Sequence, residues 1–114
     1  MDMNVAVVAL AALAHTSRLS VFRHLVERGQ DGAFPGDMAA GLQMPANTLS
    51  FHLKTLSHAN LVTSEQNGRF IRYRANFPVM QELIDYLTRN CCDGDPGRCF
   101  PATKPRVPKG VRLR

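Results

Sequence analysis

The stretch PANTLSFHLKTLSHANLVTSEQNGRFIRYR, residues 45–74, decides the fold of this chain. In its first half, leucines recur at intervals of four and three residues, which predicts an amphipathic helix from Pro45 to about His58. In its second half, Asn-Gly at residues 67–68 lies between two strand-like runs, and this dipeptide favours a two-residue type I′ hairpin turn. The stretch therefore predicts a helix that is followed directly by a β-hairpin.

The segments on either side extend this pattern. Pro35 opens a short helix, and a tight turn at residues 43–44 joins it to the leucine-bearing helix. Two helices joined by a short turn are a helix-turn-helix candidate. Beyond the hairpin, Pro78 opens a last helix with an apolar stripe, which is predicted to end near Asn90 and Cys91.

Two more helices precede the helix-turn-helix candidate. The first, over residues 2–14, is apolar on nearly all sides and needs more cover than one neighbour gives, so a second subunit is expected to supply it. Thr16 or Ser17 is predicted to cap the second helix, and Gly29 to end it. Four helices, a hairpin and a fifth helix predict a mainly α, homodimeric winged helix-turn-helix with a β-hairpin wing, over residues 1–91.

Charge is distributed unevenly along the chain. The formal net charge is +5, but five of the fourteen Lys and Arg residues lie at or after Lys104, where there are no acids, so the other nine balance the nine carboxylates. Residues 38–64 contain no Asp or Glu, and three arginines follow within 69–74. A surface built from this region would be positive, as a phosphate-facing side requires, or simply a solvated surface without acids. Residues 100–114, rich in proline and cations, are predicted to be a disordered basic tail.

The sequence favours neither a membrane segment nor an enzyme. The apolar run 5–14 is too short to span a bilayer and no Lys or Arg precedes it, so it is interpreted as an interface helix of a cytoplasmic protein. No nucleophile elbow, phosphate-binding loop or paired carboxylates are visible, and the four histidines have ordinary surface or capping explanations.

Three cysteines fall within nine residues, Cys91, Cys92 and Cys99, and form the predicted metalloid-binding segment 91–99. An odd, closely spaced set does not suit a disulfide framework, and in a reducing cytosol the side chains remain thiols. A fully extended seven-residue step spans about 23 Å, so the turn-forming residues between Cys92 and Cys99 must fold the chain back. Three thiolates without a fourth Cys or a nearby His suit As(III) or Sb(III), whereas structural zinc prefers four ligands; cadmium and lead are further candidates.

Two alternative roles compete with metalloid capture. A thiol redox sensor needs a reactive thiolate, which a helix N-terminus or nearby cations usually provide, whereas these thiols follow a helix C-terminus beside Asp93 and Asp95. A metal buffer that does not bind DNA would not need an arginine-bearing wing.

Five segments of the chain, spread over roughly residues 6–90, resemble the ArsR/SmtB family of arsenic- and metal-sensing repressors. They are Ala14-His15-Thr16-Ser17-Arg18-Leu19, Asp37-Met38-Ala39-Ala40, Asn47-Thr48-Leu49-Ser50-Phe51-His52-Leu53-Lys54-Thr55-Leu56, Ala59-Asn60-Leu61-Val62 and Gly68-Arg69-Phe70-Ile71-Arg72-Tyr73. The resemblance implies that the helix from Pro45 is the recognition helix and that residues 67–72 form the wing.

Under this resemblance, seven residues are predicted to contact operator DNA: Asn47, Thr48, Ser50, Phe51, Lys54, Arg69 and Arg72. Asn47 suits two hydrogen bonds to adenine, and Phe51 suits a thymine methyl, although simple phosphate contact by Asn47 and packing of Phe51 on the wing are the alternatives. The cations are predicted to hold phosphates. Because Pro45, Ala46 and Phe51 depart from the family's common residues, a base preference cannot be carried over.

The resemblance also bears on the cysteines. Many members of the family carry Cys-x-Cys in the helix before the recognition helix, but residues 35–40 contain no cysteine; others bind zinc through Asp and His on the last helix, but no His follows His58. A vicinal pair plus a third Cys just after the last helix resembles arsenic repressors with a C-terminal site. The implied function is repression of an arsenic-resistance operon, with release from double-stranded operator DNA when As(III) or Sb(III) binds.

Overall fold

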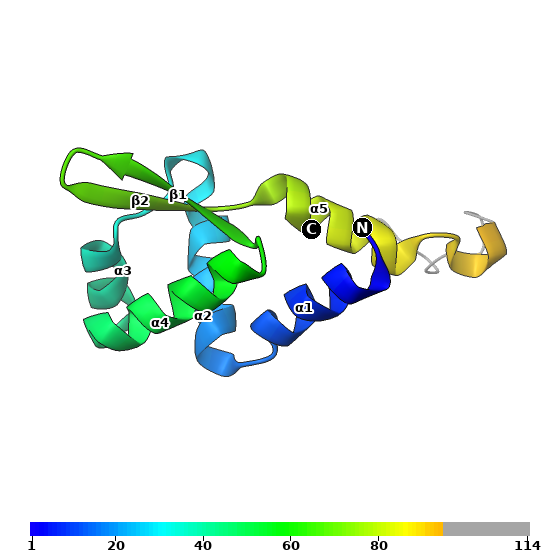
Figure 1. Ribbon diagram of the computed structural model, residues 1–114, viewed down its shortest axis with the longest axis horizontal. Helices are drawn as coiled ribbons and strands as arrows, with labels where there is room; N and C mark the ends of the chain where they lie inside the picture. The colour runs from blue at the N-terminus through cyan, green and yellow to red at the C-terminus, as the bar shows by residue number, and fades with distance from the viewer. Residues whose placement is uncertain (95–114) are drawn as a thin grey trace, which may run out of the picture.

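The computed structural model describes residues 1–94 and places five α-helices and one antiparallel hairpin there (Figure 1). In chain order the elements are α1 (Met3–Leu13), α2 (Thr16–Arg28), the 3-10 turn η1 (Gly29–Asp31), α3 (Pro35–Leu42), α4 (Ala46–His58), β1 (Val62–Asn67), β2 (Phe70–Ala75), α5 (Phe77–Thr88) and the 3-10 turn η2 (Cys91–Gly94). This order confirms the predicted winged helix-turn-helix. Cys99 and the predicted tail, 100–114, lie outside the described residues.

The start of α2 corrects one prediction. His15, and neither Thr16 nor Ser17, caps the helix: its Nδ1 accepts hydrogen bonds from the backbone N–H groups of Ser17 at 3.1 Å and Arg18 at 3.4 Å. Thr16 and Ser17 already lie within the helix, where their side chains are too far along to cap it. Gly29 ends α2 in a positive-φ conformation, as predicted.

The turn that joins α3 to α4 is tight, as predicted, but α4 begins one residue later than predicted. Gln43 adopts a left-handed conformation with φ of 52°, which reverses the chain after α3. Pro45 is extended, with φ of −59° and ψ of 145°, so it is the N-cap residue, and α4 begins at Ala46 and not at Pro45.

The last helix is shorter than predicted. Its start lies one residue before Pro78, because the side chain of Asn76 caps it by accepting a backbone hydrogen bond of 3.4 Å. It ends at Thr88 and not near Asn90, because Arg89 has an extended conformation with φ of −59° and ψ of 130°. The cysteines therefore lie in a separate turn beyond the helix.

The hydrophobic core is built around α2 and α4. The largest fully buried side chains are Val21, Leu25, Met38, Leu49, Leu53, Leu56 and Leu61. The three leucines of the predicted α4 stripe are all among them, and burial of each contributes roughly 1.5–3 kcal/mol. The fully buried residues of α1 are alanines, Ala6, Ala9 and Ala12, and Leu13 packs partly against the core. The larger side chains of Val5, Val7, Val8 and Leu10 are exposed.

The hairpin turn differs by one residue from the prediction. Asn67 pairs with Phe70, so the two loop residues are Gly68 and Arg69 and not Asn67 and Gly68. Of these two, φ is positive at Gly68 alone, at 67°, which is the pattern of a type II′ turn with glycine first, and not of type I′. The register runs from this pair back to Val62 opposite Ala75.

A short extended segment after η1 joins the hairpin on its second strand. Ala33 and Tyr73 exchange two backbone hydrogen bonds, of 2.9 and 2.8 Å, in an isolated antiparallel bridge. Gly32, beside this bridge, has a φ of +64° and lies so close to β2 that a Cβ atom there would overlap the carbonyl oxygen of Tyr73. Only glycine fits this close approach.

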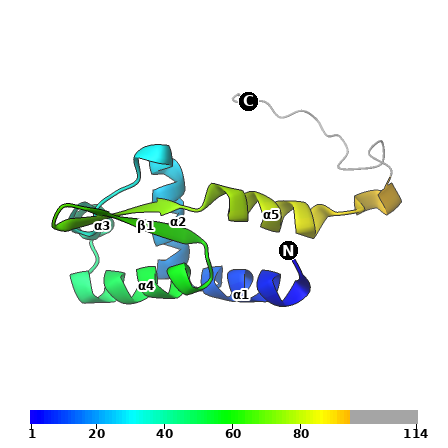
Figure 2. The same cartoon turned by 45° about the horizontal axis from the view of Figure 1, so that its top comes forward.

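The elements divide between two ends of the molecule. The hairpin loop, α3 and the start of α4 lie at one end, whereas α1 and α5 lie at the other (Figures 1 and 2). Within residues 1–94 no single helix is long and apolar enough to cross a membrane; α1 and residues 16–31 reach that length and composition only together, across a bend of 100°.

Candidate nucleic-acid interface and thiol turn

The first turns of α4 expose every side chain that the sequence assigned to DNA contact on this helix. These are Asn47, Thr48, Ser50, Phe51 and Lys54. The Oδ1 atom of Asn47 accepts a hydrogen bond from the N–H of Thr48 at 2.9 Å, which holds the asparagine at the helix start. Phe51 is 63% exposed, so this face offers a large apolar ring for contact with a partner. The opposite face of α4 is packed in the core, so this face is the one available to DNA.

The tip of the wing presents a cation and an aromatic ring. Arg69 is exposed, and so is Phe70. The ring of Phe70 meets that of Phe34 edge to face, with 6.1 Å between the ring centroids, so the wing tip lies beside the start of α3. The hairpin loop, which includes Arg69, lies at the same end of the molecule as the start of α4 (Figure 1).

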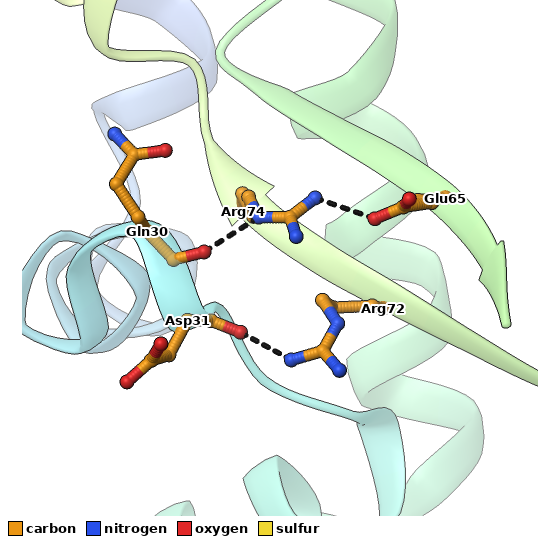
Figure 3. Close-up of polar contacts among 5 residues, drawn as sticks. All are labelled: Gln30, Asp31, Glu65, Arg72 and Arg74. Atoms are coloured by element: carbon orange, nitrogen blue, oxygen red, sulfur yellow. Dashed lines mark hydrogen bonds and ion pairs between the residues drawn. The ribbon is translucent and has the colours of Figure 1, made fainter.

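Strand alternation places Arg72 and Arg74 on the side of the hairpin that was expected to reach outward with its guanidinium groups, but both groups bind backbone carbonyls of the protein. Arg72 donates a hydrogen bond of 2.6 Å to the backbone carbonyl of Asp31 (Figure 3). Arg74 donates one of 2.6 Å to the carbonyl of Gln30 and forms an ion pair of 2.7 Å with Glu65. The hydrogen bond from Arg74 lowers the pKa of the Glu65 carboxyl, and both arginines are half-buried.

His52 lies in the core, so the surface or capping role that the sequence analysis gave it is wrong. Only 5% of the residue is exposed, and within residues 1–94 its Nδ1 atom has no hydrogen-bond partner. The ring of His15, the cap of α2, lies 5.0 Å away between centroids. The signal was present in the sequence, because position 52 falls between Leu49 and Leu56 on the apolar stripe of the helix.

Burial lowers the pKa of His52 below its usual value, and the positive potential of His15 and Arg18 lowers it further. Below about pH 6.5, the ordinary histidine value, the unfolded chain takes up a proton at this position that the folded chain excludes. We therefore expect the free energy of unfolding to fall as the pH drops below about 6.5, and to be insensitive to His52 above it. Denaturant titrations at about pH 7.5 and about pH 5.5 measure this difference.

A variant pair isolates the contribution of His52. His52→Leu, which removes the titrating group and its unpaired nitrogen, should make the fall in stability toward acid pH shallower. His58→Gln, at an exposed position of the same helix, should leave the fall unchanged. An unaltered pH dependence in His52→Leu would contradict the assignment.

Two of the three predicted sulfur ligands lie together in the turn η2. Cys91 and Cys92 are both half-buried, and positive φ angles at Asn90, Cys92 and Asp93 of 60°, 55° and 57° reverse the chain directly after α5. Within residues 1–94 no three His, Cys, Asp or Glu side chains are grouped to hold a metal ion. The third predicted ligand, Cys99, lies outside that range. A three-sulfur site therefore stays a prediction.

A helix-turn-helix with an attached hairpin wing and an exposed recognition face defines a winged-helix DNA-binding regulator. A family described as "Helix-turn-helix domain" matches residues 13–65. An "Arsenical resistance operon repressor" from Bacillus subtilis (strain 168) is 32% identical over 81 residues, which are 71% of this chain and 73% of that repressor. The chain belongs to the ArsR family of transcriptional repressors, which are not enzymes.

Solved structures agree with this fold. An ArsR-like transcriptional regulator from Rhodococcus sp. RHA1 superposes with a TM-score of 0.68 at 26% identity, over 81% of this chain and 84% of that one. The homodimeric winged helix-turn-helix DNA-binding domain of Mb0332 from Mycobacterium bovis superposes with a TM-score of 0.59 at 22% identity, over 75% of this chain and 84% of that one.

Proposed function

We propose that this protein represses an arsenic-resistance operon and leaves its operator when As(III) or Sb(III) is bound by Cys91, Cys92 and Cys99. The observation that carries the proposal is the vicinal thiol pair in a turn directly after α5, on a chain whose relative represses an arsenical resistance operon. Trivalent arsenic and antimony favour soft sulfur ligands, and three thiolates complete the pyramid that such an ion accepts.

The operator is read by the exposed face of α4, with the wing on the flanking backbone. Asn47, Ser50 and Phe51 project from the helix start, where a recognition helix meets base edges in the major groove. Thr48 lies beside them, and Lys54 is placed one turn further along to hold a phosphate. The wing arginine Arg69 supplies a second phosphate contact.

The active species is a homodimer that covers two half-sites. Exposed apolar side chains on α1 and α5 support this assembly, because a monomer would leave them in water: Val5, Val7, Val8, Leu10, Ile84 and Leu87. The solved Mb0332 domain, which is homodimeric, has the same fold. Two-fold symmetry of such a dimer matches an inverted-repeat operator.

The surroundings of the thiols favour metalloid capture over redox sensing. The side chain of Arg89, between α5 and the thiols, lies over the ring of Tyr86 with its guanidinium carbon 4.9 Å from the ring centroid. In the sequence, the pair follows the C-terminal end of α5 and precedes Asp93. Neither a helix C-terminus nor a carboxylate activates a thiol toward oxidation, whereas a soft metalloid ion binds sulfur strongly in either setting.

Release follows from where the thiols lie. Drawing Cys99 onto the pair reorganises the turn after α5, and α5 carries part of the dimer surface, so the two recognition helices change their separation. A coupling of about 1–3 kcal/mol, typical of allosteric pairs, corresponds to a 5–150-fold loss of operator affinity.

Arsenite titration of the protein bound to a promoter duplex tests the proposal. Wild-type protein should be released, while Cys91→Ser, Cys92→Ser and Cys99→Ser should each bind the duplex normally and resist release, because two sulfurs hold the ion too weakly. A gel shift or fluorescence anisotropy measures both properties.

Parallel titrations with other candidate ligands and a control variant distinguish the possible inducers. Asp93→Asn, in the same turn but with all three sulfurs intact, should release like wild type. Antimonite, cadmium, lead and a thiol oxidant are titrated in parallel; release by the oxidant alone would favour a redox sensor. Release of the triple cysteine variant by arsenite would contradict the site.

A further inference from the structure

The second strand of the wing is attached to the segment that follows α2, residues 30–33, by three adjacent links. At the centre, Ala33 and Tyr73 exchange their two backbone hydrogen bonds. On either side of Tyr73, the guanidinium groups of Arg72 and Arg74 donate to the carbonyls of Asp31 and Gln30 (Figure 3). We call this set of contacts, between residues 30–33 and 72–74, the wing seam.

Both arginines make contacts within the protein at its surface. Arg72 lies over the ring of Phe34, with its guanidinium carbon 4.7 Å from the ring centroid, and it lines a hollow of about 550 Å³ between η1, α3 and β2. Arg74 is held by an ion pair with Glu65 on the neighbouring strand. Charge-assisted hydrogen bonds to the solvent-exposed carbonyls of Gln30 and Asp31, together with the stacked guanidinium of Arg72, orient both side chains toward the protein. A phosphate contact would have to share the guanidinium group with these bonds.

The seam ties the wing to the segment that continues α2, the helix that supports the recognition helix. Val21 and Leu25 of α2 are fully buried and belong to one core cluster with Leu49 and Leu53 of α4. The wing is thus held by the segment that directly continues α2, and the recognition helix is held by the core along α2 itself.

We propose that Arg72 and Arg74 are positioning residues that fix the wing relative to α4, and that Arg69 is the wing arginine that contacts the DNA backbone. This inference rests on DNA binding by the winged helix and does not depend on the response to arsenic. It replaces the phosphate contact predicted for Arg72 with a contact inside the protein.

The salt dependence of DNA binding distinguishes the two roles. Each phosphate contact contributes about 0.9 to the slope of log K against log salt, so Arg69→Gln should lower the slope by about 1.8 per dimer and weaken binding to any duplex. Arg72→Gln should keep the wild-type slope and the affinity for a scrambled duplex, and lose affinity for the promoter duplex by about tenfold, the equivalent of one charge-assisted hydrogen bond. Arg74→Gln should behave in the same way.

Two further measurements keep the inference testable if glutamine weakens the fold. Arg72→Lys, which can still donate one hydrogen bond to Asp31, should restore part of the promoter affinity. Amide exchange at Tyr73, whose N–H bonds to Ala33, should be faster in Arg72→Gln than in Arg69→Gln. A slope loss in Arg72→Gln equal to that in Arg69→Gln, or unchanged promoter affinity in both seam variants, would overturn the proposal. No arsenite is present in these assays, so their outcome is separate from that of the release experiment.

Discussion

Gly32→Ala is expected to be the most destabilising single-methyl change in the described part of the chain. At this position a Cβ atom overlaps the carbonyl oxygen of Tyr73 and lies 2.8 Å from Cγ of Arg74, in a backbone whose φ of +64° already disfavours a side chain. The backbone bridge between Ala33 and Tyr73 cannot shift to make room for a side chain at position 32 without breaking the hydrogen bonds of the wing seam. The free energy of unfolding should fall by about 3–5 kcal/mol, and denaturant titration measures it.

A glycine three residues earlier provides the control. Gly29 has nearly the same φ, +63°, but a Cβ atom there meets nothing within 4 Å. Gly29→Ala should therefore lose only the cost of an alanine in this glycine-favouring conformation, with φ of 63° and ψ of −143°, about 1–3 kcal/mol. Equal losses in the two variants would mean that backbone conformation, and not the close approach to β2, is what Gly32 provides.

Leu87→Glu is expected to have the largest effect on DNA binding without unfolding the protomer. Leu87 is 57% exposed on α5, so a charge there is tolerated in the single chain but would be desolvated in a dimer. Loss of the dimer separates the two recognition helices and removes the benefit of binding two half-sites at once, which is about 10²–10⁴-fold. Sedimentation and anisotropy measure the assembly and the affinity.

The matched control adds a negative charge to a polar position of the same helix. Gln81 is exposed and bonds to Asp85 within α5, so Gln81→Glu should lose only a few tenths of a kcal/mol and stay dimeric. If Leu87→Glu remains a dimer with wild-type affinity, the exposed apolar face of α5 is not the interface.

The fold was predictable because its signals are local. The leucine spacing of α4, the glycine that ends α2 and the turn between α3 and α4 each depend on a few neighbouring residues, and the structure confirms all three. The sequence signal for the hairpin was also local, but the position of its turn depended on the pairing of the whole hairpin. Pairing of Val62 with Ala75 sets the register across the whole hairpin and moves the loop one residue past the Asn-Gly signal.

The parts of the site that escaped prediction depend on distant partners. The carbonyls that bind Arg72 and Arg74 lie 41 and 44 residues earlier in the chain, so nothing near these arginines reveals that they turn inward. Strand alternation predicts which side of the hairpin a residue occupies, but not whether that side faces water or another segment. His52 is a different case, because its helical spacing placed it on the core face and only its polar character argued otherwise.

The position of the thiol turn has a consequence for how such repressors diversify. Because α5 ends at Thr88, the cysteines occupy a short appendage beyond the packed helices, at the opposite end from the wing and the start of α4 (Figure 2). Residues in this appendage can be exchanged without disturbing either the core or the surface assigned to DNA. If the proposed function holds, inducer choice is set by Cys91, Cys92 and Cys99, and substitutions at these positions are where sensors for other thiophilic ions should be sought.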